Sequence, residues 1–382
     1  MTSLRLRHLG FAALTLALTV PGFAAERSDP VIVASTMPVV PDSIAEPEPA
    51  RRTTARRTTQ VRGTSPTFEV NAGIDGEIFP VFANYASLQR PSERKWGVVS
   101  VTVKNSTDAL LRTRLSVQVL GWSDQEIQIA EMAAGDVRTY IFAPTFLPRL
   151  YKNKEIAGAT VMITASGDNG ELLYSTTTPV RLRSAEDMYW GSKFRYAPFI
   201  ASWVTPHDER VEKALARAKE FMPGRRLPGY ETWKSADEQE KSTMLQARAI
   251  YRALQAQGVS YVKSSLTFGK HQNVSQRVRT PSASLAVNSA NCIDAVLLFA
   301  SLFENLDMQP VVVLVPGHAY VGVKVFRDAD RYLYVDVALT GRATFEDAVR
   351  SAEKGLRKYR ARDITRVSVA AARESGIFPM PE

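Results

Sequence analysis

The chain contains one cysteine, Cys292, which is followed by His318 and Asp336 within a short stretch. A thiolate is a strong nucleophile, an imidazole can accept and return a proton, and a carboxylate can hold the imidazole in one tautomer. Together these groups can attack the carbonyl of an amide, expel the amine and leave a thioester on the sulfur. The residue types and their order therefore predict nucleophilic acyl-transfer chemistry.

The sequence around the cysteine predicts a helix that begins at this residue. Asn291 is a suitable N-cap, and Asp294 three residues later completes a capping box. Apolar residues then recur at helical spacing until Pro310 ends the helix. Cys292 would thus occupy the first helical turn, where the helix dipole favours a thiolate.

Three strands are expected after this helix. Residues 311–315 are apolar, as in a buried strand, and a Pro-Gly turn leads into a second strand that begins at His318. A further turn leads to a third strand at 332–339, which carries Asp336. The imidazole and the carboxylate would then lie on neighbouring strands beside the helix start.

A cysteine at a helix start, a histidine on a strand and an aspartate on the next strand resemble the transglutaminase-like superfamily of papain-fold enzymes. The contexts Asn291-Cys292-Ile293-Asp294 and Gly317-His318-Ala319 are similar to those of a bacterial exported subgroup. The resemblance implies that Cys292 is the nucleophile, His318 the general base and acid, and Asp336 the orienting carboxylate. It is direct around these motifs and looser over the C-terminal half of the chain.

Each of these residues also has an ordinary structural interpretation. A lone cysteine on an apolar helix is usually a small buried hydrophobe, His318 could be a hydrogen-bonded strand residue, and Asp336 could be a solvated acid. The three together, in this order, favour the catalytic interpretation. The alternative is a non-catalytic exported binding or scaffold protein with a vestigial transglutaminase-like domain.

An acyl-transfer site also needs a hydrogen-bond donor for the oxyanion, beside the backbone N–H of the cysteine. Gln272, Asn288 and Asn291 all precede the nucleophile and are candidates, and the sequence does not choose among them. Asn291 also has the simpler role of N-cap. Residues 268–288 are interpreted as a long polar loop, and such loops are often functional.

The sequence indicates no metal site and no cofactor. With one cysteine and four histidines in the whole chain, zinc would need carboxylate ligands that no motif marks. No glycine-rich phosphate loop of the Walker or dinucleotide type is present. Neither ATP nor NAD is therefore implied.

The first residues predict export. Residues 1–25 combine two arginines, an apolar run and small residues at a cleavage site, as in a secretory signal peptide. The apolar run is short for a membrane anchor. We therefore expect an exported protein, with the periplasm as its compartment, where an unpaired cysteine is otherwise a liability.

Residues 26–65 predict a disordered linker that is rich in proline and arginine. The linker contributes to the formal net charge of +9, so it could contact an anionic envelope surface, although a solvated linker without a partner explains it equally well. No stacking aromatics are interleaved with the arginines, which argues against nucleic acid.

The remaining chain predicts an α+β protein with two domains, for which its length of 382 residues suffices. Short alternating strands at 66–183 predict an immunoglobulin-like β-sandwich, without paired cysteines. Residues 184–382 would form the papain/transglutaminase-like domain. The aromatic residues at 184–211 could line a substrate-binding surface, but a buried interface between the two domains is favoured.

The expected substrate is a protein or a peptide. If water resolves the thioester, the protein is a peptidase or amidase; if an amine does so, it is a cross-linking transglutaminase. Residue spacing does not distinguish the two outcomes, and hydrolysis is preferred.

Overall fold

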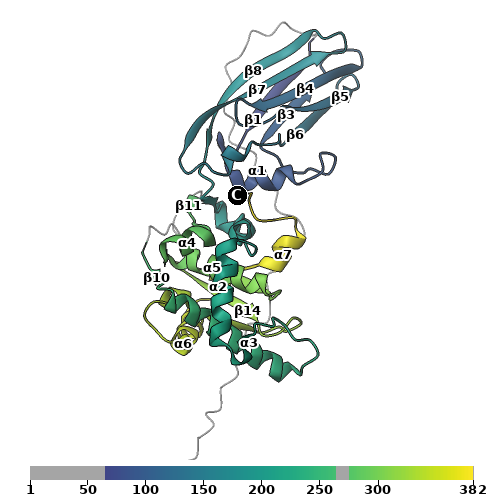
Figure 1. The fold of residues 1–382 in the computed structure, drawn as a ribbon. Coiled ribbons are helices and arrows are strands. Elements are labelled where there is room, and N and C mark those ends of the chain that lie inside the picture. The colour runs from purple at the N-terminus through teal and green to yellow at the C-terminus, as the bar shows by residue number, and fades with distance from the viewer. Residues whose placement is uncertain (1–64, 264–274, 382) are drawn as a thin grey trace, which may run out of the picture. The chain divides into compact units, whose positions relative to one another are not determined.

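The computed structural model describes residues 65–263 and 275–381. Helices and strands are mixed along the chain, which confirms the predicted α+β class (Figure 1). The predicted signal peptide, nearly all of the predicted linker and Gln272 lie outside the described residues. Among the residues described, no helix is both long and apolar enough to cross a membrane.

The first part of the chain forms two sheets that share one apolar core. Its elements are β1 (Thr67–Ala72), β2 (Glu77–Ile78), α1 (Pro80–Ser87), β3 (Val99–Lys104), β4 (Leu111–Val119), β5 (Glu126–Met132), β6 (Val137–Phe142), η1 (Pro148–Leu150), β7 (Ala157–Gly167) and β8 (Leu172–Leu182). The sheets have the orders β1-β3-β6 and β2-β8-β7-β4-β5. Because successive strand residues point to opposite faces, Val99, Val101 and Val103 of β3 are buried in this core.

Five strands of this part are predicted by their alternating sequences, at 98–104, 114–120, 138–142, 159–165 and 172–182, and all are present. β5 is not predicted, because its apolar residues change face within the strand. Ile127 and Ile129 are exposed, whereas Ala130 and Met132 are buried.

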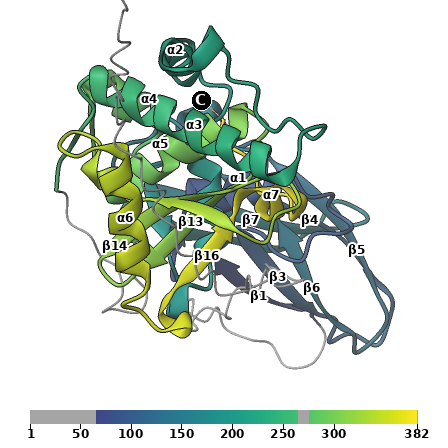
Figure 2. The same cartoon turned by 90° about the horizontal axis from the view of Figure 1, so that it is seen from below.

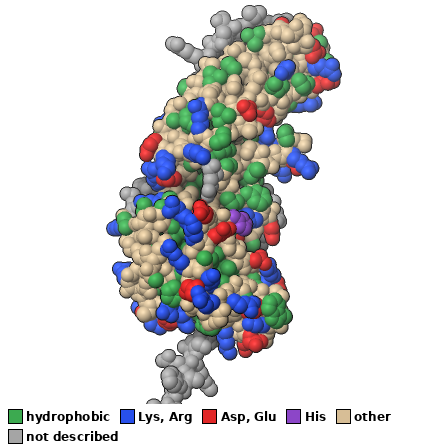
Figure 3. All heavy atoms as spheres, in the orientation of Figure 1, with side chains coloured by type: hydrophobic (Ala, Val, Ile, Leu, Met, Phe, Trp, Pro, Cys, Tyr) green, Lys and Arg blue, Asp and Glu red, His purple; other side chains and the backbone are tan. Residues whose placement is uncertain are grey.

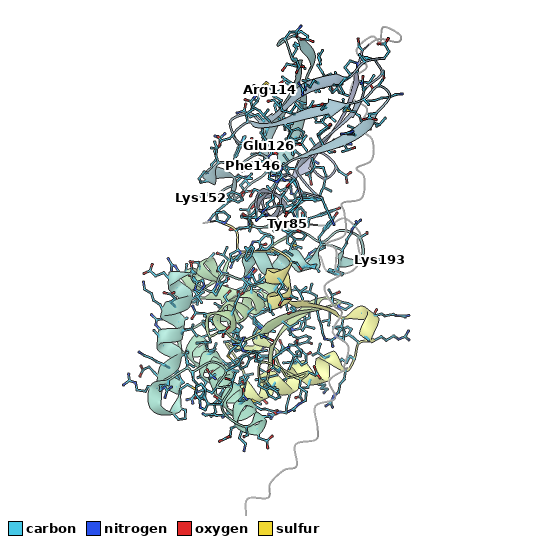
Figure 4. All side chains as sticks on the ribbon, turned by 90° about the vertical axis from the view of Figure 1, so that its right-hand side faces the viewer. Tyr85, Arg114, Glu126, Phe146, Lys152 and Lys193 are labelled. Atoms are coloured by element: carbon cyan, nitrogen blue, oxygen red, sulfur yellow. The ribbon has the colours of Figure 1, made fainter. Side chains whose placement is uncertain are left out.

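A buried ion pair holds the start of β5. The carboxylate of Glu126 (Figure 4) lies 2.7 Å from the guanidinium of Arg94, and their side chains are 16% and 4% exposed. The same carboxylate accepts a hydrogen bond from the backbone N–H of Ala143 at 2.7 Å. With both oxygens engaged, the charge has the partners that a buried carboxylate needs.

The second part of the chain is built on a four-stranded antiparallel sheet. Its strands are β13 (Pro310–Val315), β14 (His318–Lys324), β15 (Tyr332–Val335) and β16 (Thr365–Ser368), and two helices beside it are α5 (Cys292–Asn305) and α6 (Phe345–Leu356). In the order β15-β14-β13-β16, β13 is buried along its whole length. Figure 2 shows α5 and α6 beside the strands of this sheet. Val312 and Leu314 face the core that contains α5, whereas Val311 and Val313 pack with Ala352 of α6. Burial on both faces explains the continuous apolar run.

The other elements of this part are mostly short. They are β9 (Asp187–Tyr189), η2 (Ser192–Phe194), η3 (Ala197–Trp203), α2 (Glu209–Ala218), η4 (Lys219–Phe221), η5 (Pro223–Arg225), α3 (Ala236–Ala256), β10 (Ser260–Tyr261), β11 (Ser275–Arg277), α4 (Pro281–Val287), β12 (Ser289–Ala290), η6 (Val337–Leu339), η7 (Ala361–Asp363) and α7 (Val369–Glu374). The aromatic residues near η3 are buried rather than arranged along an open wall; among them are Tyr189, Trp190, Tyr196, Phe199 and Trp203.

Three local predictions are wrong. The expected loop at 268–288 contains β11 and α4 where it is described, because Thr280 caps α4 and a proline follows it. The apolar spacing at 243–257 predicts a helix there, but α3 begins seven residues before Thr243, because Ser235 and Glu238 form a capping box ahead of two polar turns. β15 ends at Val335, so Asp336 follows the strand instead of lying within it.

Candidate active site

Cys292 is the first residue of α5, and its side chain is fully buried. The predicted capping box is present: Oδ1 of Asn291 accepts a hydrogen bond from the N–H of Asp294 at 2.9 Å, and the carboxylate of Asp294 accepts one from the N–H of Asn291 at 3.4 Å. Among the described residues, the N–H groups of Cys292 and Ile293 have no hydrogen-bond partner. The first turn of α5 therefore keeps two backbone donors beside the thiol.

Asp294 also connects the helix start to the preceding segment. Its Oδ1 accepts a hydrogen bond from the N–H of Arg279 at 2.9 Å. Burial raises the pKa of Asp294, although the hydrogen bonds from Arg279 and Asn291 oppose this shift. The carboxylate of Asp294 thus ties the first turn of α5, which carries Cys292, to the backbone of both Asn291 and Arg279.

His318 is the first residue of β14, and its imidazole lies between the thiol and a carboxylate. Nε2 lies 3.0 Å from Oδ1 of Asp336. The side chain of Cys292 is close enough to raise the pKa of the same ring by hydrogen bonding and by its charge. Because Nε2 is engaged by the carboxylate, Nδ1 is the nitrogen available to the sulfur. The structure therefore brings the three predicted residues together, from α5, β14 and the end of β15.

The surroundings of His318 favour the imidazolium. Burial is the largest single influence and lowers the pKa, but the hydrogen bonds to Asp336 and Cys292 and the charges of both groups outweigh it. The result is a pKa raised to about 9. Near neutral pH the ring would therefore carry a proton.

Asp336 is 7% exposed, and α6 supplies its other contacts. Oδ2 accepts a hydrogen bond from the hydroxyl of Ser351 at 2.8 Å, and the backbone N–H donates to the carbonyl oxygen of Ala348 at 3.0 Å. Both carboxylate oxygens are therefore engaged, one by the imidazole and one by the helix.

The ring of Tyr320 packs against the imidazole of His318. Tyr320 is two residues beyond His318 on β14, so both side chains leave the same face of the strand. The rings meet edge to face, with centroids 4.7 Å apart and an interplanar angle of 83°. The hydroxyl of Tyr320 lies over Gly355 of α6, where a Cβ atom would approach it to 2.1 Å.

Tyr261 is a third group near the thiol. β10 pairs in parallel with β12, which places Tyr261 opposite Ala290, two residues before Cys292. Its side chain is 39% exposed. Burial raises the pKa of Tyr261, the charges of Cys292 and Asp336 add to this, and Arg342 opposes it. The phenol is thus within electrostatic reach of the candidate nucleophile.

The candidate oxyanion donors have different positions. Asn288 ends α4 in the left-handed conformation with φ 48°, and its Oδ1 accepts a hydrogen bond from Gln257 at 3.0 Å. The amide oxygen of Asn291 belongs to the capping box. Gln272 lies outside the described residues. The structure therefore shows a cap or turn role for the two asparagines.

Three residues of this site are missing from the sequence prediction. Tyr320 could have been found from its i, i+2 relation to His318 on a predicted strand. Ser351 and Tyr261 have no such signal, because they approach the site from other elements.

Within residues 65–263 and 275–381, no group of three or more His, Cys, Asp or Glu residues could hold a metal ion. Comparisons with known proteins give no match, either to a family model or to a curated protein. The resemblance to transglutaminase-like enzymes therefore rests on the residues around Cys292, His318 and Asp336.

Proposed function

We propose that the protein is an exported cysteine enzyme of the transglutaminase-like type, which transfers the acyl group of a peptide amide. The observation that carries the proposal is the contact chain at the helix start. The only cysteine raises the pKa of an imidazole by hydrogen bonding and by its charge, and Nε2 of this imidazole is 3.0 Å from the buried carboxylate of Asp336. In this proposal residues 66–183 are an immunoglobulin-like β-sandwich, and residues 184–382 are the papain-like domain.

The reaction would begin with attack of the Cys292 thiolate on the amide carbonyl. The C–N bond then breaks, and the imidazolium of His318 gives its proton to the leaving amine. A thioester remains on the sulfur. The neutral imidazole next takes a proton from water or from a second amine, which attacks the thioester and releases the acid or a new amide. Asp336 keeps the imidazole in one tautomer throughout.

The tetrahedral oxyanion needs donors, and we assign them to the backbone N–H of Cys292 and the hydroxyl of Tyr261. Two tyrosines, Tyr261 and Tyr320, lie near the thiol. Burial is the largest influence that raises the pKa of each, and the charge of Cys292 adds to it. The hydroxyl of Tyr320 is packed against Gly355, whereas Tyr261 is partly exposed. Tyr261 therefore suits a donor that must meet a substrate.

The proposed partner is a protein or peptide that also reaches the exported compartment. On the face drawn in Figure 3, basic and acidic side chains of the described residues are interspersed. A nucleic-acid surface would instead gather positive charge in one stripe. Hydrolysis is the preferred outcome, and incorporation of a fluorescent primary amine into a peptide would identify transamidation.

A non-catalytic binding protein is the second candidate, and full burial of Cys292 is the observation that favours it. Iodoacetamide alkylation separates the two functions. Because the chain has one cysteine, the mass increase of the whole protein reports this residue alone. The enzyme should be alkylated near neutral pH at least about tenfold faster than its His318→Ala variant. Equal rates in both proteins, each shown to be folded, would leave only the binding protein.

A further inference from the structure

The face of α6 that packs on the sheet consists of small residues at helical spacing. Ala348, Ser351, Ala352 and Gly355 recur at i, i+3, i+4 and i+7, and both alanines are fully buried. Small side chains allow the helix to approach the sheet closely. This approach places α6 beside the carboxylate of Asp336, which has just left β15.

We propose that Ser351 is a positioning residue of the acyl-transfer site, whose hydroxyl keeps the carboxylate of Asp336 on Nε2 of His318. The hydroxyl lies 2.8 Å from Oδ2, while Oδ1 lies 3.0 Å from the imidazole nitrogen. The terminal torsion of an aspartate is broad, so a carboxylate held at one oxygen can rotate. Holding both oxygens restricts this rotation.

The low exposure of Asp336 makes the hydrogen bond from Ser351 important for the position of the carboxylate. The residue is 7% exposed, so water has little access to replace the serine hydroxyl. The charge of Asp336 acts on titratable groups of three other elements, α3, β10 and β14, and these groups are Tyr251, Tyr261, His318 and Tyr320. Of these only His318 can be cationic, so a displaced carboxylate would lose an opposite charge at 3.0 Å.

A carboxylate that is no longer held by Ser351 should also change the imidazole. Asp336 raises the pKa of His318 through a hydrogen bond and through its charge, against the lowering effect of burial. Loss of the hydroxyl should therefore move the pKa of His318 from about 9 towards 6.5. If Ser351 only solvates the carboxylate, its removal leaves the charge in place and the pKa does not fall.

The inference rests on the proposed function, and the test keeps the two apart. The rate of Cys292 alkylation near neutral pH and the NMR titration of the His318 imidazole would be measured in the full chain. Both measurements would be made on the wild type and on Ser351→Ala, Ser351→Thr and Ser351→Val. His318→Ala lacks the imidazole, so only its alkylation rate would be measured. The threonine and valine variants have nearly the same shape and differ in the hydroxyl, so they remain informative if the alanine variant unfolds. Ser375→Ala, at the residue that follows α7, removes a serine hydroxyl that donates to the carbonyl oxygen of Ala371 at 2.9 Å, and it serves as the control.

We expect Ser351→Ala and Ser351→Val to be alkylated about ten- to a hundredfold more slowly than the wild type, with a lowered pKa of His318. Ser351→Thr should retain most of both properties, and Ser375→Ala should match the wild type. If His318→Ala is slow but the serine variants behave like the wild type, Ser351 has no positioning role. If His318→Ala itself equals the wild type, the proposed function fails and the inference fails with it.

Discussion

The Nε2 atom of His318 lies 3.0 Å from Oδ1 of Asp336, a residue eighteen positions further along the chain. His318 opens β14 and Asp336 follows β15, and because these two strands pair antiparallel, both residues lie at the same end of the hairpin. The side chain of Cys292 at the start of α5 raises the pKa of the same imidazole by hydrogen bonding and by its charge. Four predictions follow from this contact chain and its neighbours.

Replacing Asp336 by asparagine should slow alkylation of Cys292 near neutral pH by about tenfold or more. The amide has nearly the same shape but no charge, so it no longer stabilises the imidazolium that accompanies the thiolate. The rate would be followed by mass spectrometry of the intact protein. Asp330→Asn changes an exposed aspartate and should leave the rate unaltered. An unchanged rate in folded Asp336→Asn would show that the carboxylate does not assist the imidazole.

The stability of the protein should fall as the pH rises from about 6.5 to 9, the two pKa values of His318 in the unfolded and folded states. A folded-state pKa above the unfolded one means that the folded protein binds the proton more tightly. This contribution is fully present below 6.5 and is lost as the pH passes through 9, and it amounts to about 3 kcal/mol.

Urea unfolding at several pH values in this window would measure the effect. His318→Ala should lose this part of the pH dependence, whereas a variant of the exposed His207 should keep it. The same slope in His318→Ala and in the wild type would assign the pH dependence to other groups.

Tyr261→Phe should separate two reactions of the same thiol. Acylation by p-nitrophenyl acetate passes through a tetrahedral oxyanion, whereas alkylation by iodoacetamide does not. Loss of an oxyanion donor should slow acylation about a hundredfold and leave alkylation unchanged. Tyr174→Phe, which alters a tyrosine stacked on Phe68 in the first part of the chain, is the control. Equal slowing of both reactions would indicate a general disturbance of Cys292 instead.

Gly355→Ala should destabilise the fold by about 1–3 kcal/mol, because the new Cβ would lie 2.1 Å from the hydroxyl of Tyr320. Tyr320→Phe removes that hydroxyl but leaves Cζ at 2.9 Å, so the double variant should recover part of the loss in urea unfolding. Gly158→Ala, where a Cβ meets no atom within 4 Å, should cost little. Additive effects of the two substitutions would show that this contact is unimportant.

The same contacts show what could be predicted from the chain. Cys292 could be placed at a helix start because Asn291 and Asp294 form a cap within four residues. The sequence predicts Asp336 within a strand at 332–339, whereas it lies just after β15, because the apolar run continues past the end of this strand into η6. α4 was missed because its seven residues are too few to show helical periodicity.

By itself, the sequence determined the order of Cys292, His318 and Asp336 and the α+β class, because caps, turns and apolar runs act over a few neighbouring residues. The tertiary structure alone decided that Ser351 holds Asp336 and that the hydroxyl of Tyr320 lies over Gly355. These contacts depend on how closely α6 packs on the sheet. That distance is set by the volumes of side chains from segments far apart in the chain, and no local pattern records it.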